Sequence, residues 1–350
     1  MEKKIIFILG SMGKGGAERV ISILSQDFAN RGWQTDICML LFNKVEYELN
    51  PTTSVHDFSN GGGSRIKRLP YWLKAIRSVV LKENPDVIVS FAARINIITM
   101  LACLGLHKKI VVSERNDPNA DGRGRIVDFL TNLLYPRAAA VVFQTKRAMN
   151  YFGDRVKKRG CIIPNPITVD AYVGVTNKNK IVTVGSMKEQ KNHILLIEAF
   201  SDVVRKHPEL ELTIYGEGTL RKKIQNRIDE LGISENVFMP GVSSTVHKDI
   251  SDASIFVLSS DYEGLSNALL EAMMMGIPCI STNCAGSDEY VEDGVNGLLT
   301  PVGDRNALAS AIVGFVENDE LRERCGREAK KVSERVGLER TLEQWRRVTE

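Results

Sequence analysis

The chain has 350 residues, of which 43% are hydrophobic and 25% charged, and its formal net charge is +3. This is enough for two globular domains of about 150 residues each, although a single α/β barrel also reaches this size. No apolar run approaches the roughly 20 residues that span a bilayer, and the first apolar segment is too short for a secretory signal, so we expect a cytoplasmic protein.

Charge is distributed unevenly along the sequence. Residues 1–175 hold 25 Lys and Arg against 15 Asp and Glu, which leaves 21 basic and 28 acidic residues for the remainder. The first half is therefore the one expected to contact an anionic partner. The cysteines show neither CxxC nor Cys/His pairing at metal-ligand spacing, which predicts reduced, mostly buried thiols and no metal site.

Short β-branched runs alternate with helical patterns throughout, which predicts an α/β fold with mostly parallel sheets. The first series of expected strands is 5–9, 35–41, 86–90, 110–113 and 139–144. The second series is 181–184, 212–215, 237–239, 255–259, 278–281 and 297–300. A stretch rich in Pro, Asn and Thr separates them and predicts a linker near 164–179. Two Rossmann-like domains joined in this way leave a cleft at the carboxyl ends of their strands, where doubly wound folds bind ligands.

The first expected strand leads into a glycine-rich turn before a helix. The turn is not a Walker loop, because Lys14 is followed by Gly15, and it lacks the GxGxxG spacing of dinucleotide-binding loops. Gly15 and Gly16 still allow a ligand to approach the backbone closely. A plain strand-to-helix turn is the alternative.

A basic amphipathic segment runs from Arg65 to Lys82. It holds six basic residues and no acidic one, with apolar residues at near-helical spacing. We predict that this segment contacts an anionic membrane surface, with Tyr71 and Trp72 at the interface. Alternatively, it is a helix that packs its apolar side on a sheet, and Pro70 is expected to prevent one continuous helix.

The second series of strands opens with a strand that ends at Gly185, and Lys191 follows at the start of the next helix. A lysine in this position points into the predicted cleft and can neutralise a leaving diphosphate. An isolated lysine is otherwise usually solvated surface.

Residues 262–276 place two carboxylates around the start of a helix. Ser266 or Asn267 is expected to cap the helix, and Gly276 to end it. The amide groups after Gly264, with the positive end of the helix dipole, favour a phosphate. Glu271 can then accept hydrogen bonds from a ribose, and Glu263 can hold sugar hydroxyls; the alternative is a turn cap and a solvated helix carboxylate.

Several motifs together resemble family 4 retaining glycosyltransferases of the GT-B fold. The resemblance is carried, in the family's order, by Gly-Gly-Ala-Glu-Arg near the amino terminus, Gln-Lys-Asn ending at Asn192, Tyr215-Gly216-Glu217-Gly218, the Glu263 and Glu271 pair, and Asp293-Gly294-Val295-Asn296-Gly297-Leu298-Leu299. It implies a transfer that needs neither a metal nor a cofactor, with the sugar nucleotide held mainly by the second domain and the acceptor mainly by the first.

The resemblance also implies roles for individual residues. Lys191 would bind the diphosphate, Glu271 the ribose, and the amides of Leu265 and Ser266 a phosphate. Glu263 would hold the donor sugar and lie nearest the chemistry. The remaining donor contacts would be of two kinds. Gly15 and Gly16 would contact the phosphates. Glu217, with its neighbour Gly216, and Val242 would lie near the base.

Two positions depart from the family pattern. The family usually has Arg after the glycine of the Lys191 loop, where this chain has Ser186; Lys188 or an arginine of the first domain would have to compensate. Many relatives carry a histidine near the acceptor, where this chain has Glu114 and Arg115. This pair follows an expected strand and is predicted to contact the acceptor, with a surface ion pair as the alternative.

The sequence thus predicts three segments: an acceptor-side domain at 1–165, a nucleotide-sugar domain at 166–335 and a C-terminal helix at 336–350 that packs back on the first domain. The expected donor is a UDP-sugar, and the expected acceptor is a polyprenyl diphosphate-linked or other surface glycan at the inner face of the cell membrane. A sugar-nucleotide epimerase and a non-catalytic nucleotide-binding subunit remain open. Nucleic acid is not expected, because no stacking platform or reader motif is present.

Overall fold

The computed structural model describes residues 3–13, 15–59, 64–170, 175–284 and 286–350. The chain divides into two compact units, which are described separately below. Unit 1 comprises Met1–Pro166 with Leu338–Glu350, and unit 2 comprises Ile167–Gly337. Lys14 and residues 171–174 of the expected linker lie outside the described residues.

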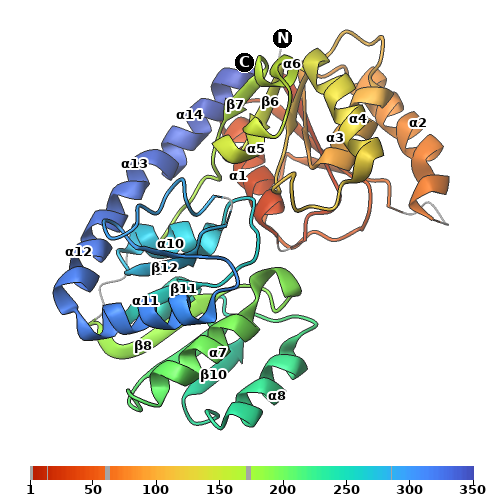
Figure 1. Ribbon diagram of the computed structural model, residues 1–350. Helices are drawn as coiled ribbons and strands as arrows, with labels where there is room; N and C mark the ends of the chain where they lie inside the picture. Colours follow the sequence, from red (N-terminus) through yellow and green to blue (C-terminus); the bar gives the residue numbers. More distant parts are fainter. Residues whose placement is uncertain (1–2, 14, 60–63, 171–174, 285) are drawn as a thin grey trace. The chain divides into compact units, whose positions relative to one another are not determined.

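Unit 1 is built on a parallel sheet with the strand order β3-β2-β1-β4-β5-β6-β7 (Figure 1). Its strands are β1 (Lys4–Leu9), β2 (Gln34–Met39), β3 (Ser54–Asp57), β4 (Val87–Phe91), β5 (Lys109–Ser113), β6 (Ala140–Phe143) and β7 (Gly160–Ile162). Its helices are α1 (Gly16–Asn30), α2 (Arg65–Glu83), α3 (Ala93–Ala102), α4 (Gly124–Leu134), η1 (Tyr135–Arg137), α5 (Lys146–Asn150), α6 (Asp154–Lys157) and α14 (Leu338–Thr349).

Both faces of this sheet are covered, which explains the continuous apolar run of β1. Ile5 and Phe7 face a core shared with α1 and α14, whereas Ile6 and Ile8 face a second core shared with α2 and α3. Burying each such side chain stabilises the fold by about 1.5–3 kcal/mol. The strand is therefore fixed by burial on both sides, as parallel sheets require.

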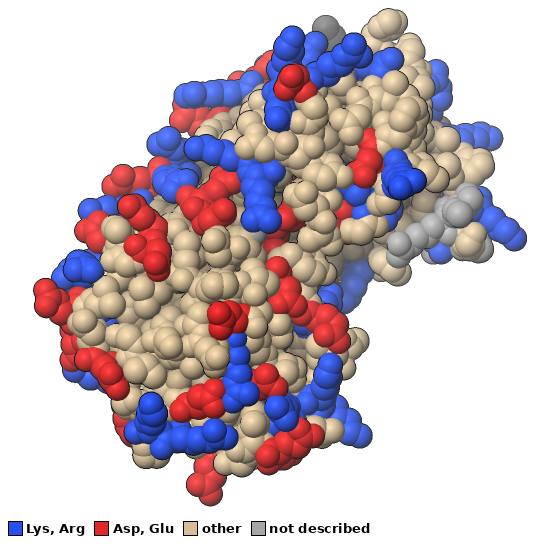
Figure 2. Space-filling view, in the orientation of Figure 1, with Lys and Arg blue, Asp and Glu red and all other residues tan. Residues whose placement is uncertain are grey.

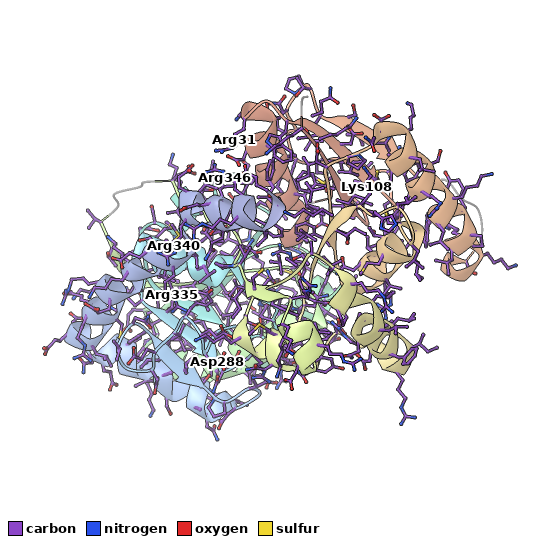
Figure 3. The ribbon with its side chains drawn as sticks, turned by 90° about the horizontal axis from the view of Figure 1, so that it is seen from above. Arg31, Lys108, Asp288, Arg335, Arg340 and Arg346 are labelled. Carbon is purple, nitrogen blue, oxygen red and sulfur yellow. The ribbon has the colours of Figure 1, made fainter. Side chains whose placement is uncertain are left out.

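Helix α14 returns to unit 1 from the far end of the sequence. Trp345 is fully buried and stacks on Phe91, with 5.6 Å between the ring centroids. Arg346 donates through Nε to Asp27 of α1 at 2.9 Å, and Arg31 lies 3.9 Å from the Glu350 carboxylate (Figure 3). Stacking fixes α14 against β4, and the Arg346–Asp27 pair fixes it against α1.

Helix α2 corrects two expectations about the basic segment. It is one continuous helix with Pro70 inside it. The exposed proline removes one hydrogen bond near the helix start, which packing of the next turns compensates. Trp72 is buried and donates to the Phe58 carbonyl at 3.1 Å, and Ile76 and Val80 lie in the same core. The prediction that Trp72 lies at a membrane surface is therefore wrong, because the apolar side of α2 packs against the sheet.

Unit 2 repeats the doubly wound plan with the strand order β10-β9-β8-β11-β12-β13, again parallel. Its strands are β8 (Asn177–Val184), β9 (Glu211–Tyr215), β10 (Val237–Gly241), β11 (Ala253–Leu258), β12 (Cys279–Thr282) and β13 (Leu298–Thr300). Its helices are η2 (Glu189–Lys191), α7 (His193–Val204), α8 (Arg221–Leu231), α9 (Val246–Ile250), α10 (Asn267–Met275), α11 (Arg305–Glu317), α12 (Asp319–Ala329), η3 (Lys330–Val332) and α13 (Ser333–Val336).

The prediction of an α/β fold with two Rossmann-like parallel sheets is confirmed. Every expected strand exists, but β3 and β7 had no counterpart among them. Both are short edge strands without a fully buried residue, so they lack the apolar run that marks the central strands. In addition, β8 begins at Asn177, inside the expected linker.

Two smaller findings concern the rest of the sequence. The cysteines are free thiols, buried except for the half-buried Cys161, as predicted. Within the described ranges, every helix is too short or too polar to span a bilayer.

Candidate active site

The strand order of unit 2 reverses between β8 and β11, which is where a doubly wound sheet binds its ligand. β8 ends at Val184 and is followed by the loop that carries Lys191. β11 ends at Leu258 and is followed by the loop that carries Glu263. Because both strands are parallel and adjacent, the two loops emerge side by side at the carboxyl edge of the sheet.

Lys191 and Glu263 form an ion pair at this edge. Glu263 is 6% exposed and also accepts hydrogen bonds from Ser260 Oγ at 2.8 Å and from Gln190 Nε2 at 3.3 Å. The Lys191 side chain crosses Gly185, where a Cβ would lie 3.3 Å from the lysine stem. The structure thus brings together the two residues predicted to be catalytic, and gives the lysine one carboxylate partner that a diphosphate can replace.

Close packing of neighbouring loops explains the glycines around Lys191. Gly216 has a φ of +142°, and a Cβ there would lie 2.0 Å from the Gly185 carbonyl. A Cβ at Gly218 would lie 2.3 Å from the Met187 carbonyl, and Met187 donates its amide to the Glu217 carbonyl at 2.9 Å. Larger residues would therefore push this turn away from the lysine loop.

Other predicted donor contacts lie on the surface of unit 2. Ser186 is exposed beside Gly185. The Glu217 carboxylate accepts from Arg221 at 2.7 Å and is half-exposed, and Val242 is exposed just after β10. Glu217 and Val242 follow β9 and β10, so they lie farther along the edge than Lys191.

Helix α10 begins as predicted, with Ser266 as its N-cap. Ser266 Oγ accepts from the Leu269 amide at 3.4 Å, and Gly276 ends the helix with a left-handed φ of +79°. Gly264 is approached by Gly286, where a Cβ would lie 2.7 Å from the Gly264 carbonyl. The start of α10, with buried Leu265 before it, is thus fixed in place at the same edge.

Glu271 is 7% exposed, so it is not a solvated helix carboxylate. Its Oε2 lies 3.5 Å from His247 Nε2, and Nδ1 of the same ring lies 3.4 Å from the Asp170 carboxylate. The Glu271 carboxylate raises the pKa of His247; burial of the ring opposes this effect, and the Asp170 carboxylate reinforces it.

Sequence reasoning did not single out His247. It lies on the short helix α9, outside every motif, and no local pattern connects it with Glu271. In contrast, His193 is buried under the lysine loop, and burial together with Lys191 lowers its pKa to about 4, so it stays neutral, in keeping with a structural role.

In unit 1, Gly15 and Gly16 lie where β1 passes into α1. Gly15 is the N-cap, with Gly16 as the first helical residue. A Cβ at Gly15 would lie 2.3 Å from the Glu18 carboxylate, and the Gly15 carbonyl accepts from the Tyr47 hydroxyl at 3.2 Å. The glycine therefore makes room for a carboxylate in the first turn of α1.

Glu114 lies in the interior of unit 1, after β5. It is 2% exposed and accepts from Arg123 Nη2 at 2.8 Å and from the Tyr135 hydroxyl. Burial raises the pKa of Glu114, against the opposing effect of Arg123. The surface ion pair is wrong as an interpretation, because both Glu114 oxygens are held inside the fold. Contact with an acceptor stays a prediction.

Arg115 is also enclosed, at 8% exposure. Its guanidinium lies 4.4 Å from the Phe91 ring centroid and 5.4 Å from that of Trp345, and Nη1 donates to Asn165 at 2.9 Å. Burial lowers its pKa to about 9. Arg115 thus joins the sheet of unit 1 to α14.

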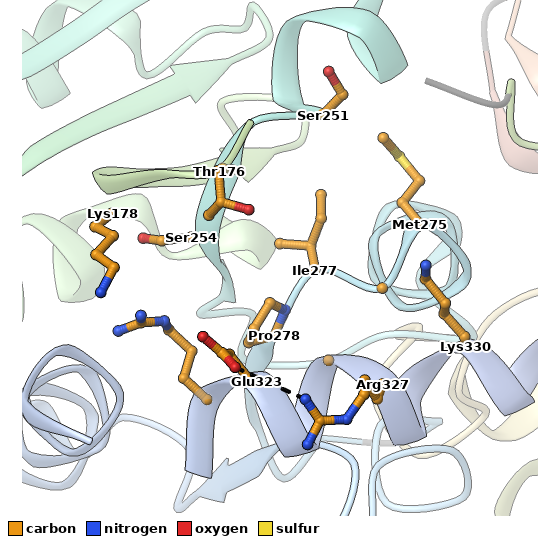
Figure 4. Close-up of a pocket in the computed structure, with 14 residues that line it drawn as sticks. Thr176, Lys178, Ser251, Ser254, Met275, Ile277, Pro278, Glu323, Arg327 and Lys330 are labelled. Atoms are coloured by element: carbon orange, nitrogen blue, oxygen red, sulfur yellow. Dashed lines mark ion pairs between the residues drawn. The ribbon is translucent and has the colours of Figure 1, made fainter. Parts of the chain in front are cut away.

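A separate pocket of about 400 Å³ lies at the opposite edge of the unit 2 sheet (Figure 4). Its lining includes Lys178, Pro278, Arg327 and Lys330, which come from the amino ends of strands and from α12 and η3. The Lys330 stem covers Gly276, so its ammonium lies near the carbonyl end of α10, a normal stabilising position for a cation. This pocket does not contain the predicted donor residues.

Comparison with known proteins identifies related sequences over most of the chain. A family model described as glycosyl transferases group 1 matches residues 169–332, and one described as Glycosyltransferase Family 4 matches residues 14–171. The N-acetylgalactosamine-N,N'-diacetylbacillosaminyl-diphospho-undecaprenol 4-alpha-N-acetylgalactosaminyltransferase of Campylobacter jejuni is 28% identical over 356 residues, which covers 94% of each chain. The poly(ribitol-phosphate) alpha-N-acetylglucosaminyltransferase of Staphylococcus aureus is 30% identical over 192 residues, or 52% of this chain and 39% of that protein.

Solved structures share the fold. Anabaena Alr3699/HepE in complex with UDP and glucose superposes with a TM-score of 0.79 at 18% identity, covering 99% of both chains. The apo form of the lipopolysaccharide outer core galactosyltransferase WaaB has a TM-score of 0.82 at 18% identity, covering 99% of this chain and 98% of that one.

Proposed function

Since the chain belongs to glycosyltransferase family 4 and has the GT-B fold, we propose that it transfers a hexose or N-acetylhexosamine from a UDP-sugar to a hydroxyl of a lipid-linked glycan. The transfer retains the anomeric configuration and uses no metal ion. The observation that carries this proposal is the Lys191–Glu263 pair at the β8/β11 switch point, with Glu271 on the adjacent helix.

Donor and acceptor are inferred from relatives. The Campylobacter enzyme is named for a diphospho-undecaprenol-linked acceptor, and Anabaena Alr3699/HepE was solved with UDP and glucose. The buried Glu271 suits a ribose diol, which donates hydrogen bonds, and the amide groups of Leu265 and Ser266 at the start of α10 suit a phosphate.

In the proposed reaction, Lys191 exchanges Glu263 for the donor diphosphate. The bond between the anomeric carbon and the diphosphate oxygen breaks, and its electron pair stays on the leaving UDP, where Lys191 neutralises the growing charge. The acceptor oxygen attacks the same face of the sugar, and its proton passes to the leaving phosphate. Glu263, released from the lysine, holds the sugar and balances the positive charge on its ring.

The other residues follow from the same proposal. Gly15 and Gly16 contact the phosphates, while Glu217 and Val242 contact the base. Ser186 takes the place of the usual arginine and leaves its neighbour Lys188, which is also exposed, as the second cation of the loop.

Membrane association is part of the proposal, because a polyprenyl acceptor keeps its lipid in the bilayer. The exposed Lys67, Lys74 and Lys82 of α2 supply positive charge toward an anionic inner surface. The buried Trp72 does not contribute.

The test is a donor screen that measures UDP release, run with and without extracted lipid-linked glycans. We expect UDP release that requires both one UDP-sugar and the acceptor, and a glycan product with the donor's anomeric configuration. An epimer formed from the UDP-sugar alone would instead support the epimerase. UDP binding without turnover across all donors and acceptors would favour a non-catalytic subunit.

A further inference from the structure

Helix α4 of unit 1 carries apolar side chains on the side that faces away from the protein. Ile126, Phe129 and Leu133 are 76%, 66% and 45% exposed. Their spacing of three and four residues places them on one face of the helix. The other face is also apolar, with Leu134 buried and Leu130 partly buried in the core. Single exposed apolar residues are ordinary, but a continuous stripe of three marks an interaction surface.

The stripe begins at the edge of the sheet where unit 1 is expected to hold the acceptor. α4 follows the loop that leaves the carboxyl end of β5, and the buried Arg123 fixes that loop through Glu114 and Asp121. Ile126 comes directly after this fixed loop. A lipid held along the stripe would therefore have its polar end near this edge.

Positive charge lies at the start of the stripe. Arg125 is exposed beside Ile126, and the exposed Arg94 of α3 donates to the Gly122 carbonyl at 3.4 Å, just before α4. Asp128, the acidic residue of α4, accepts from the Tyr151 hydroxyl at 2.8 Å and lies 3.9 Å from Arg123. Figure 2 shows mostly uncharged surface over the part of unit 1 where α4 lies in Figure 1.

We propose that this face of α4, defined by Ile126, Phe129 and Leu133 with Arg94 and Arg125, binds the surface of an anionic bilayer. Aliphatic and aromatic side chains with arginines at one end are the composition of helices that lie in a membrane interface, where the arginine head groups reach lipid phosphates. Three side chains cover far less than the roughly 800 Å² per partner of a stable protein interface, which argues against a second copy.

The proposal places the apolar membrane contact on α4, because Trp72 of α2 is buried, and leaves the exposed lysines of α2 as additional positive charge. It rests on the proposed function in one respect, because a lipid-linked acceptor is the reason for a bilayer to lie at this edge. Vesicle binding and transfer to a lipid-free glycan separate the two claims.

The experiment is sedimentation of the full chain with vesicles of equal parts phosphatidylglycerol and phosphatidylcholine, and with vesicles of phosphatidylcholine alone. We expect the protein to bind the anionic vesicles, and Ile126→Ser/Phe129→Ser/Leu133→Ser to weaken this binding at least tenfold. Arg125→Glu should weaken it several-fold. As a matched control, Val175→Ser/Val302→Ser removes two exposed apolar side chains from unit 2 and should leave vesicle binding unchanged.

Two further measurements keep the result interpretable. Thermal unfolding of the triple variant should match the parent, because the three side chains are exposed, and its transfer to a lipid-free glycan should be unchanged. Equal vesicle binding by parent and triple variant, or no binding by either, would overturn the proposal. A parent dimer that the triple variant converts to a monomer in sedimentation equilibrium would also overturn it, and would assign the stripe to self-association. Vesicle binding with no transfer to any glycan would instead count against the proposed function alone.

Discussion

The carboxyl edges of the two sheets both carry charged side chains directly after a strand, but they hold these charges differently. In unit 2, Lys191 and Glu263 pair with each other across two neighbouring loops, and Glu271 pairs with His247. In unit 1, the Glu114 carboxylate is held on both oxygens by Arg123 and Tyr135. A charge that follows a strand is therefore not in itself a ligand contact.

The deciding property is whether a charged group has a partner that a ligand can replace. A phosphate can take Lys191 from Glu263, since the lysine gains a new anion and the carboxylate keeps Ser260 and Gln190 as donors. A ligand cannot take Glu114 from Arg123 without breaking an ion pair that is buried inside the fold. Under the proposed function, the same position in the fold serves binding in unit 2 and stability in unit 1.

The largest expected effect is the loss of transfer when the exchangeable pair is broken. Lys191→Ala removes the cation that neutralises the leaving diphosphate, and we expect kcat to fall by about 10²–10³ and UDP binding to weaken. Glu263→Ala should lose most activity as well, because it also leaves Lys191 without its buried partner. Initial rates of UDP release and calorimetric titration with UDP measure both effects.

Lys206→Ala is the matched control, since this exposed lysine lies beyond the far end of α7 and should leave kcat unchanged. If both site variants turned over at near-normal rates, the edge of unit 2 would not be the active site, and the proposed difference between the charged residues of the two sheets would be wrong.

The second expected effect tests the closed network of unit 1. Arg123→Met leaves Glu114 and Asp121 without their common partner, and breaking a buried pair of this kind lowers the free energy of unfolding by about 3 kcal/mol. Urea unfolding measures the loss. The neighbouring Arg125→Met is exposed and should change stability by less than about 0.5 kcal/mol.

Glu114→Gln separates the structural role from acceptor binding. The network predicts reduced stability with an acceptor KM close to that of the parent. A raised acceptor KM at unchanged stability would show that Glu114 does contact the acceptor.

The sequence predicted the features that depend on residues close together in the chain. The central strands carry continuous apolar runs, and the cap of α10 lies next to the helix that it starts, so burial and hydrogen bonding act within a few residues. Lys191 and Glu263 were found because each follows such a strand. The Glu271–His247 pair and the enclosure of Glu114 and Arg115 join segments far apart in the chain, so no local pattern contains them.

The third effect concerns the partner of Glu271. His247→Gln removes the ion pair, and we expect a rise of about fivefold in the donor KM, which corresponds to about 1 kcal/mol for one lost hydrogen bond. The change in kcat should be smaller, because Glu271 is assigned to the ribose and not to the breaking bond. His207→Gln, a partly buried histidine of the same unit that faces Glu209 and Glu317, is the control and should leave the donor KM unchanged.

The pH dependence gives His247 a second test. Glu271, with Asp170, raises the pKa of His247 above its ordinary value of 6.5, so the charged ring stabilises the fold fully below pH 6.5. That contribution is lost as the pH rises through the raised pKa. The stability difference between the parent and His247→Gln should therefore be larger at pH 5.5 than at pH 9, and a difference that did not change with pH would show that the ring is uncharged.

The smallest expected effect is on UDP binding, when one more cation is added at the edge of unit 2. Ser186 is exposed next to Gly185, where the family usually has arginine, so Ser186→Arg should restore a phosphate contact without disturbing the core. Exposed pairs contribute up to about 1 kcal/mol, which predicts UDP binding tightened by about threefold to fivefold at low salt and less at high salt. Ser186→Met supplies similar length without charge and should bind UDP like the parent. If the arginine and methionine variants bound UDP equally, the phosphates would not lie over Ser186, and the second cation of this loop would have to be sought at Lys188.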